Sequence, residues 1–407
     1  MSDAQREFEI ILWGASGFTG RLVADYLYAN YGKEGNLKWA LAGRNQSKLE
    51  AIVEEIAGAK DALPIVIADS DDLAAMKAMA ERAKVICTTV GPYALYGTKL
   101  VAACVEKGTH YCDLTGELQW MNRVIRQYQT EAEQSGARIV HTCGFDCIPS
   151  DMGVYYLQQQ MKQAHGVAAT HIKLRTKAFS GGFSGGTVYS MMNMMEEVDS
   201  DPEIATILAD PYALNPAGSH RGEDENDQTT AIYDKDFKSW TSPFAMAAIN
   251  TRVVRRSNAL MNQAYGEDFR YDEATLSDSS IKAHAAALAG NMVMGSMAIK
   301  PLRKLAAGVL PAPGEGPSKT ARENGFYEVW LHGCHPDDRG KDMRAIVKGD
   351  MDPGYGSTSK MLAECAVCLA RDDLDVAGGF WTPASAMGDH LLARLQQHSG
   401  LSFSLAD

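Results

Sequence analysis

An apolar segment that runs straight into regularly spaced glycines constrains the fold of this chain more than any other feature. Phe8–Trp13 has the character of a buried strand, and Gly14, Gly17 and Gly20 follow it. In a strand–turn–helix context, such glycines allow a tight turn, close approach of a pyrophosphate to the backbone, and close packing of the next helix. A phosphate would then lie at the positive end of that helix. The spacing alone is weak evidence, so the following segments decide its meaning.

The segments after the glycines complete a strand–helix–strand unit. Arg21–Leu27 carries apolar residues at helical spacing, and Leu37–Ala42 has the character of a second strand. This unit has about the 30 residues of a dinucleotide-binding βαβ motif. Residues 63–68 and 84–90 predict two more strands, and strands alternate with helices up to about residue 150. The pattern predicts an α/β fold with a Rossmann-type, doubly wound parallel sheet.

The residues after the second strand indicate which dinucleotide binds. An NAD-dependent enzyme usually has Asp or Glu here to bind the ribose 2′-hydroxyl, but this chain has Gly43, Arg44 and Asn45. Arg44 can stack on adenine and, with Ser47 or Lys48, pair with a 2′-phosphate. We therefore expect NADP as the cofactor. The alternative is a solvated loop followed by a helix cap.

The ends of the third and fourth strands extend the expected cofactor site. Asp69 would lie beside the adenine, or would cap the helix that begins near Asp72. Ligands of open α/β sheets bind beyond the carboxyl ends of strands, so Tyr93 should approach the reacting carbon. The residues expected at the cofactor are Gly14, Ala15, Ser16, Gly17, Phe18, Thr19, Gly20, Gly43, Arg44, Asn45, Lys48, Asp69, Val90, Gly91, Pro92 and Tyr93.

Polar residues also follow the next two expected strands. Asp113, Thr115 and Glu117 come after one strand, and Asp146 comes after the other. Both strand ends should face the same crevice, where carboxyl groups can orient a substrate or move protons. Helix capping explains Thr115 and Glu117 without chemistry. The expected catalytic residues are therefore Tyr93, Asp113 and Asp146.

Charge and composition exclude several classes of function. The chain has 407 residues, a net charge of −12 and 45% apolar residues, which is typical of a globular protein long enough for two domains. Its negative charge argues against a nucleic-acid partner. The polar start Met1–Glu7 lacks an apolar signal core, so we expect a cytoplasmic location.

The eight cysteines are expected to be reduced thiols, and no metal is expected. Cys365 and Cys368 are spaced like a redox or metal motif, but they lie in an apolar segment that predicts one helix. Cys334 stands between His332 and His335, and these residues do not complete a ligand set.

Residues 285–299 form an apolar run that raises the question of partners. The run is shorter than the roughly 20 residues that span a bilayer, and Lys300, Arg303 and Lys304 follow it. It could lie at a membrane surface or guard a lipid-like substrate. Burial in the protein or in a homodimer interface is the other explanation. Residues 285–304 are therefore the expected place of any peripheral membrane or lipid contact.

Several motifs together resemble one known family. They are Gly14–Gly20, Ala42–Arg44, Val90–Tyr93, Tyr111–Glu117, Cys143–Asp151, Ser184–Thr187, Arg252–Ser257 and Gly379–Ala384. In this order they resemble the saccharopine dehydrogenase-like oxidoreductases, and most closely the branch that includes trans-acting enoyl reductases. Cys147 stands where a serine is expected in that branch, which puts a hydroxyl role at this position in doubt.

The resemblance implies a divided architecture and a reductase activity. Residues 1–150 plus 352–407 would form the NADP-binding Rossmann domain, and residues 151–351 a mixed α/β domain for the substrate and for oligomerisation. Hydride would pass from NADPH to an enoyl or lipid-related substrate, free or as an acyl group. The alternatives are an imine or amino-acid oxidoreductase of the saccharopine type and a non-catalytic NADP-binding sensor or scaffold. A short-chain dehydrogenase is excluded, because no Tyr has Lys four residues later.

Overall fold

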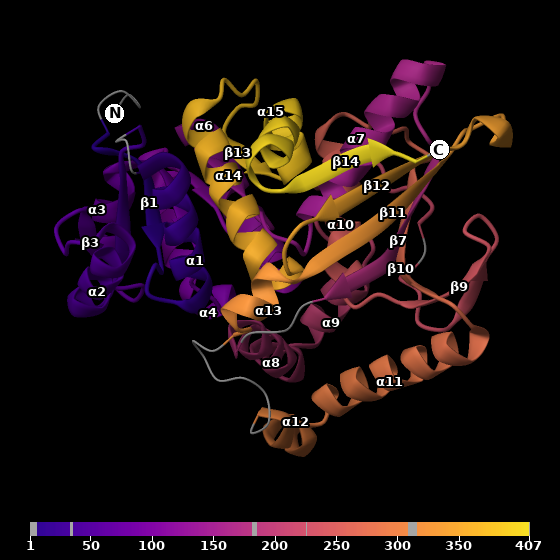
Figure 1. Cartoon of the computed structure of the whole chain (residues 1–407), viewed down its shortest axis with the longest axis horizontal. Helices are drawn as coiled ribbons and strands as arrows, with labels where there is room; N and C mark the ends of the chain where they lie inside the picture. Colours follow the sequence, from indigo (N-terminus) through magenta and orange to yellow (C-terminus); the bar gives the residue numbers. More distant parts are fainter. Residues whose placement is uncertain (1–5, 33–35, 181–184, 225, 308–315, 407) are drawn as a thin grey trace.

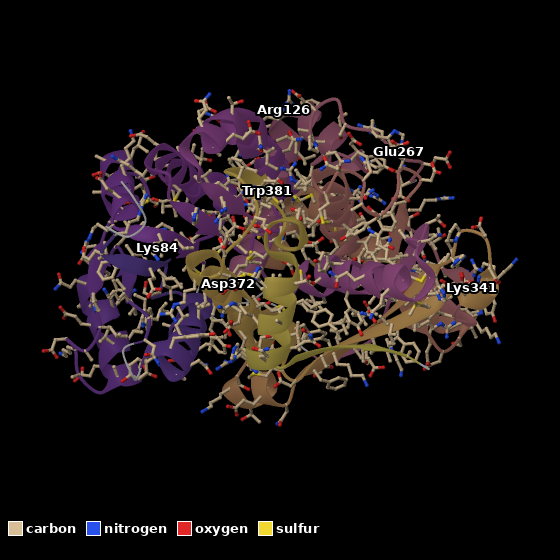
Figure 2. The ribbon with its side chains drawn as sticks, turned by 90° about the horizontal axis from the view of Figure 1, so that it is seen from above. Lys84, Arg126, Glu267, Lys341, Asp372 and Trp381 are labelled. Atoms are coloured by element: carbon tan, nitrogen blue, oxygen red, sulfur yellow. The ribbon has the colours of Figure 1, made fainter. Side chains whose placement is uncertain are left out.

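The computed structural model describes residues 6–32, 36–180, 185–224, 226–307 and 316–406. Two seven-stranded sheets lie side by side and are joined by helices (Figure 1). Lys84 of the first sheet and Lys341, beside the second, lie at opposite ends of the molecule, with Asp372 and Trp381 between them (Figure 2). Ser184, the first residue of the motif Ser184–Thr187, lies outside the described residues.

The first sheet is entirely parallel, as the alternation of strands and helices predicts. From one edge to the other, its strands are β13 (Gly379–Trp381), β6 (Arg138–Val140), β5 (His110–Cys112), β4 (Ala83–Thr88), β1 (Phe8–Trp13), β2 (Trp39–Gly43) and β3 (Ile65–Ile67). Strands β2 and β3 are added on one side of β1, and β4, β5, β6 and β13 are added on its other side. The strand order therefore reverses between β1 and β4, and α/β sheets bind their ligands at such a switch point. This order confirms the expected Rossmann-type fold.

Strand β1 shows why this sheet is buried on both faces. Its Ile10 and Leu12 belong to one hydrophobic core, and Ile11 and Trp13 belong to another. Successive side chains of a strand point to opposite faces, so one apolar run supplies two cores. The helices on the first face are α1 (Phe18–Leu27), α2 (Gln46–Ala57) and α14 (Thr358–Arg371), and those on the second are α3 (Leu73–Glu81), α5 (Thr98–Lys107) and α6 (Leu118–Ser135).

The second sheet is mixed. Its central strands β7 and β10 are parallel to each other, and the remaining neighbours are antiparallel. Its strands are β14 (Leu401–Leu405), β12 (Met343–Gly349), β11 (Phe326–Cys334), β7 (His171–Ser180), β10 (Arg270–Ser277), β9 (Ser239–Pro243) and β8 (Ile232–Asp234). Helices α7 (Ile148–His165), α10 (Ala247–Leu260) and α15 (Pro383–His398) pack on it.

One hydrophobic core continues from the first sheet into the second. Leu12 of β1 and Leu331 of β11 belong to the same buried cluster, and Leu157 of α7 lies in it as well. The two halves therefore cannot separate without exposing apolar surface. The remaining helical segments are η2 (Tyr28–Gly32), α4 (Tyr93–Tyr96), α8 (Gly185–Ser200), α9 (Pro202–Ala209), α11 (Ser280–Ala298), α12 (Lys300–Ala307), α13 (Lys319–Glu323), η3 (Arg339–Lys341) and η4 (Pro353–Ser357).

The C-terminal region contributes to both sheets. Strand β13 extends the first sheet beside β6, whereas β14 pairs with β12 in the second sheet. After α15, the chain thus returns to the second sheet, so the segment 352–407 contributes a strand to each sheet. The expected domain boundaries stay predictions.

Two of the cysteines lie in a helix, as expected, and the apolar run 285–299 is helical as well. All eight cysteines are free and buried, and Cys365 and Cys368 lie within α14. The apolar run 285–299 forms most of α11, which lies along the lower edge of the molecule in Figure 1. Among the described residues, no helix is long and apolar enough to cross a membrane.

Candidate functional site

The glycine loop between β1 and α1 has the geometry that its spacing predicts. Gly14 adopts a left-handed backbone conformation with φ of +89°. A Cβ at Gly20 would overlap the Gly14 carbonyl oxygen and lie 2.8 Å from the Thr89 hydroxyl oxygen. The Gly17 N–H donates to the Gly14 carbonyl oxygen at 2.9 Å. The first helical turn can approach β1 this closely only because side chains are absent.

The N-terminus of α1 is open to an anion. Its N-cap is Gly17, no side chain accepts a hydrogen bond from the cap, and no acidic residue lies in the first turn. The backbone N–H groups at this end therefore remain available to a phosphate. Ser16 and Gly17 are exposed, Ala15 is buried and Thr19 is half-buried. The loop residues thus fit the pyrophosphate of a dinucleotide.

Phe18 closes one side of the glycine loop. Its ring packs edge-on against Tyr355 with centroids 5.3 Å apart, and the Arg322 guanidinium lies 5.4 Å from its centroid. These partners come from residues far along the sequence. The second half of the chain therefore helps to shape the cofactor end.

Arg44 is exposed at the end of β2 and makes no hydrogen bond or ion pair within the described part of the chain. Its guanidinium is free to meet a ligand. The Asn45 side chain caps α2, because its oxygen accepts from the Lys48 N–H at 3.0 Å. This segment therefore contains both the helix cap of the alternative interpretation and two exposed basic residues, Arg44 and Lys48. Gly43 is buried in β2.

Asp69 is exposed and forms a local turn. Its carboxylate accepts from the Asp71 N–H at 3.0 Å, and the N-cap of α3 is Asp72. Capping by Asp69 is therefore wrong. Contact of Asp69 with adenine stays a prediction.

Tyr93 lies under the loop that follows β4. Its side chain is 3% exposed, its hydroxyl donates to the Thr88 carbonyl oxygen at 3.3 Å, and its ring stacks on Trp120. Burial raises the pKa of Tyr93 well above its usual value. The hydroxyl lies between the ends of β4 and β5, so the geometry does not favour direct contact with a substrate.

The other expected cofactor residues of this loop precede Tyr93. Val90 packs on Gly14, and Gly91 is exposed. Pro92 is the N-cap residue of α4.

Asp113 ties the ends of β5 and β6 together. It is fully buried, and its carboxylate lies 2.7 Å from the Nδ1 atom of His141. It also accepts from the Tyr111 hydroxyl at 2.9 Å and from the N–H groups of Thr115 and Thr142, both at 3.1 Å. With four partners, the carboxylate is fully engaged. The geometry favours a structural role for Asp113, and catalysis by it stays a prediction.

Asp146, which follows β6, has a different environment. No described residue donates a hydrogen bond to its carboxylate, and Gly116 leaves space beside it, since a Cβ there would lie 3.5 Å from Oδ2. Burial alone raises the pKa of Asp146 to about 6. A half-buried, unpartnered carboxyl group with this pKa can hold or release a proton near neutral pH. Of the three expected catalytic residues, Asp146 has the most suitable environment.

Helix α8, which follows strand β7 of the second sheet, reaches this edge of the first sheet. Glu117 accepts from the N–H groups of Tyr93 and Ala94, both at 2.8 Å, and from the Ser190 side chain of α8. Glu117 therefore caps α4. Its side chain makes no capping hydrogen bond to α6, the helix that it precedes. A Cβ at Gly91 would also lie 3.4 Å from the Ser190 hydroxyl oxygen. Sequence reasoning missed Ser190, because nothing in the pattern places α8 beside β4.

A buried polar network beneath the site was also missed. Asn250 donates to Glu273 at 2.9 Å and to the Ser150 hydroxyl at 3.1 Å, and the Tyr271 hydroxyl donates to Glu273 at 2.6 Å. Burial raises the pKa of Glu273 to about 7. The Cys147 thiol donates to the Asn250 side-chain oxygen at 3.3 Å. The thiol thus makes a hydrogen bond that a serine hydroxyl could also make.

A second carboxyl group lies buried where α7 meets α15. Asp151 accepts from the Ser257 hydroxyl at 2.5 Å and from the Ala384 N–H at 2.8 Å. Burial raises its pKa to about 7. These contacts join α7 to α10 and to α15.

A cluster with metal-ligand chemistry occurs on the second sheet. The ligand atoms of Asp236, His332 and Cys334 lie within 4.8 Å of one another, and a pocket of about 520 Å³ adjoins them. Arg339 donates to the Cys334 sulfur at 3.2 Å and pairs with Asp236, and Lys173 also pairs with Asp236 at 2.7 Å. Cations already neutralise this cluster. The expectation of no metal stays a prediction, although Asp236 was not foreseen as a neighbour of the two other residues.

Comparisons with known proteins agree with this geometry. Residues 10–140 match the family described as the saccharopine dehydrogenase NADP-binding domain. A trans-acting enoyl reductase of Mycobacterium ulcerans is 39% identical over 98% of this chain and 97% of its own length. A trans-acting enoyl reductase of Mycobacterium tuberculosis is 38% identical over 97% of each chain.

The fold has a solved counterpart. The apo saccharopine dehydrogenase (L-Glu forming) of Saccharomyces cerevisiae superposes with a TM-score of 0.53, at 14% identity, over 98% of this chain and 100% of that one. This similarity concerns the fold alone. The full-length relatives, together with the glycine loop and the parallel sheet, confirm the resemblance found in the sequence. The chain therefore belongs to the saccharopine dehydrogenase-like oxidoreductases, with an NADP-binding domain, on the branch whose members are named trans-acting enoyl reductases.

Proposed function

We propose that this protein reduces the carbon–carbon double bond of an α,β-unsaturated acyl substrate, using NADPH and a proton from Asp146. The observation that carries the proposal is the unpartnered Asp146 carboxyl group, with a pKa of about 6, at the sheet edge that also carries the glycine loop. The names of the relatives support the enoyl substrate.

The cofactor end of the chain is suited to NADPH in two places. The open N-terminus of α1 can bind the pyrophosphate, and the exposed guanidinium of Arg44 can pair with a 2′-phosphate. Lys48 lies one helical turn further on and adds a second positive charge. Bound NADPH would supply a hydride for the β-carbon of the substrate.

Asp146 would complete the reduction. Hydride addition at the β-carbon leaves an enolate, whose α-carbon must receive a proton. The protonated Asp146 carboxyl group can give that proton and can regain one from solvent afterwards. The N–H of the exposed Gly91 lies at the same edge, where it can orient the acyl carbonyl, and the Ser190 side chain that bonds to Glu117 lies beside it. The sum of the steps is one hydride and one proton added across the double bond.

The test compares substrates and cofactors directly. The purified protein is titrated with NADPH and NADH by fluorescence, and cofactor oxidation is then followed by absorbance with enoyl thioesters or imino acids. We expect preference for NADPH and oxidation with enoyl thioesters. Oxidation with imino acids alone would favour a saccharopine-type reaction. Tight binding of NADPH without turnover of either class would favour a sensor or scaffold.

A further inference from the structure

Helix α11 is attached to the protein along a narrow stripe of its surface. Ala283 and Ala287 are buried, and Asn291 donates to the Thr229 carbonyl oxygen at 3.0 Å. Near the helix end, Met297 is buried. The remainder of the helix lies along the outside of the molecule (Figure 1). The contact side is therefore built mainly from small side chains.

The opposite side of α11 is an exposed apolar ridge. Ile281 is 83% exposed, Leu288 63% and Met292 65%. At about 100° per residue, these three side chains stand within roughly 20° of one line along the helix. Ile299 and Leu302 continue the apolar surface beyond its end.

This concentration of apolar side chains is unusual within the molecule. Of the sixteen large apolar side chains that are exposed in the described part of the chain, seven lie between residues 281 and 302. Scattered exposed apolar residues are normal, but a contiguous apolar surface marks a contact site. The ridge therefore needs a partner to cover it.

Charge distinguishes between the possible partners. Residues 279–314 contain no Asp or Glu and include Lys282, Lys300, Arg303 and Lys304, although the whole chain carries a net charge of −12. Asp278 pairs with Lys282, and Asp199 pairs with both Lys300 and Arg303. The four cations outnumber these two carboxylates, so the region remains basic overall. Two copies of an acidic chain repel each other, whereas an anionic lipid surface attracts this basic region.

The positions of the lysines also fit a lipid surface. Lys282 and Lys300 lie near the two ends of α11, and their side chains are mostly exposed. Lysines beside an apolar ridge can extend their ammonium groups toward lipid headgroups while the ridge enters the acyl region. We propose that α11 and the start of α12 form a membrane-surface anchor that inserts the Ile281–Leu288–Met292 ridge into an anionic lipid layer. This proposal does not depend on the proposed reductase activity.

Vesicle sedimentation tests the anchor. The full chain is mixed with phosphatidylcholine vesicles that contain either no anionic lipid or about one third phosphatidylglycerol. We expect the protein to sediment with the anionic vesicles. Replacing both Leu288→Glu and Met292→Glu should lower the partition coefficient at least about tenfold. The control pair Phe326→Glu and Leu405→Glu alters apolar side chains on β11 and β14 that are 49% and 42% exposed, and it should leave partition unchanged.

The electrostatic part has its own variant. Lys282→Gln combined with Lys300→Gln should reduce the preference for anionic vesicles several-fold, since two cations beside the ridge are lost. NADPH titration of every variant checks that the cofactor site is intact. The proposal is overturned if the wild-type chain stays in the supernatant with both kinds of vesicle. It is also overturned if the Leu288→Glu, Met292→Glu variant turns a dimer into a monomer without changing sedimentation, because the ridge would then join two copies.

Discussion

The two ends of the same sheet edge are built in different ways. At the cofactor end, Gly14, Gly17 and Gly20 form the loop with their backbones, and all lie within one short segment. At the proposed reaction end, the environments of Asp113 and Asp146 are set by residues from several strands and helices. A backbone-built site is visible in a local pattern. A side-chain site is defined only when distant segments meet.

The same difference separates the two aspartates. Asp113 has four hydrogen-bond partners, and Asp146 has none among the described residues. Both follow a strand of the parallel sheet, so the sequence pattern predicts a catalytic role for each of them equally. Their environments give them opposite roles, one structural and one suited to proton transfer.

The largest expected effect sharpens this contrast. Asp146→Asn should lower kcat about a thousandfold and leave the Kd for NADPH unchanged, because a proton donor is lost without change at the glycine loop. The wild-type rate should fall as pH rises through about 6, where the carboxyl group loses its proton, and the variant should lack this limb. Steady-state kinetics across pH measure both effects.

Asp113→Asn is the matched comparison for that variant. An amide cannot accept from all of the donors around Asp113, so the unfolding free energy should fall by about 2–4 kcal/mol in urea titrations. If Asp146→Asn keeps wild-type kcat and Asp113→Asn loses all activity while remaining folded, the roles assigned to the two residues are reversed.

Gly20→Ala tests the backbone-built end. The added Cβ would overlap the Gly14 carbonyl oxygen, so α1 must shift away from β1. We expect NADPH to bind about a hundredfold more weakly and stability to fall by about 1–3 kcal/mol. Fluorescence titration and urea unfolding measure these changes. The control is Gly290→Ala, where a Cβ meets nothing within 4 Å, and wild-type affinity in both variants would contradict the account of the loop.

Glu273→Gln tests the buried network that supports the reaction end. The raised pKa of about 7 means that the folded protein holds a proton that the unfolded chain releases near pH 4.5. Stability from this group is present below about pH 4.5 and is lost as pH rises through about 7, by on the order of 3 kcal/mol. The variant should therefore show a flatter decline of unfolding free energy from pH 5 to pH 8. An unchanged slope would show that Glu273 is ionised throughout.

Arg44→Gln has the smallest expected effect. An exposed guanidinium on a 2′-phosphate is partly screened, so NADPH affinity should fall about tenfold, while NADH affinity stays the same. Parallel titrations with both cofactors measure the ratio. Asn45→Ala is a useful companion, since it should weaken the α2 cap and not the discrimination between cofactors. An equal loss for NADPH and NADH would place Arg44 elsewhere than at the 2′-phosphate.

The predictable parts of the molecule are those with local causes. The run Phe8–Trp13 alternates between two cores, so it predicts a strand buried on both faces, and the glycines after it predict the loop. Asn45, expected at the cofactor, caps α2, and a helix cap in this segment was the alternative that the sequence left open. The parallel sheet followed from the alternation of strands and helices.

The rest depends on contacts between distant residues. Ser150 meets Asn250 and Glu273 only because α7, α10 and β10 pack together, and no periodicity encodes that meeting. In the same way, Ser190 reaches Glu117 from α8, which follows a strand of the second sheet. Strand β14 returns to the second sheet after α15 because its partner β12 is available there. Each case is a product of tertiary packing.

Transfer of label from NADPH to substrate tests the central claim most directly. The protein is incubated with an enoyl thioester and NADPH that carries deuterium at the transferable position, and the product is analysed by mass spectrometry. The account predicts one deuterium at the β-carbon and one solvent hydrogen at the α-carbon, with the reaction slowed strongly by Asp146→Asn. Tight binding of NADPH with no deuterium in the product, or deuterium transfer only to an imine carbon, would contradict it.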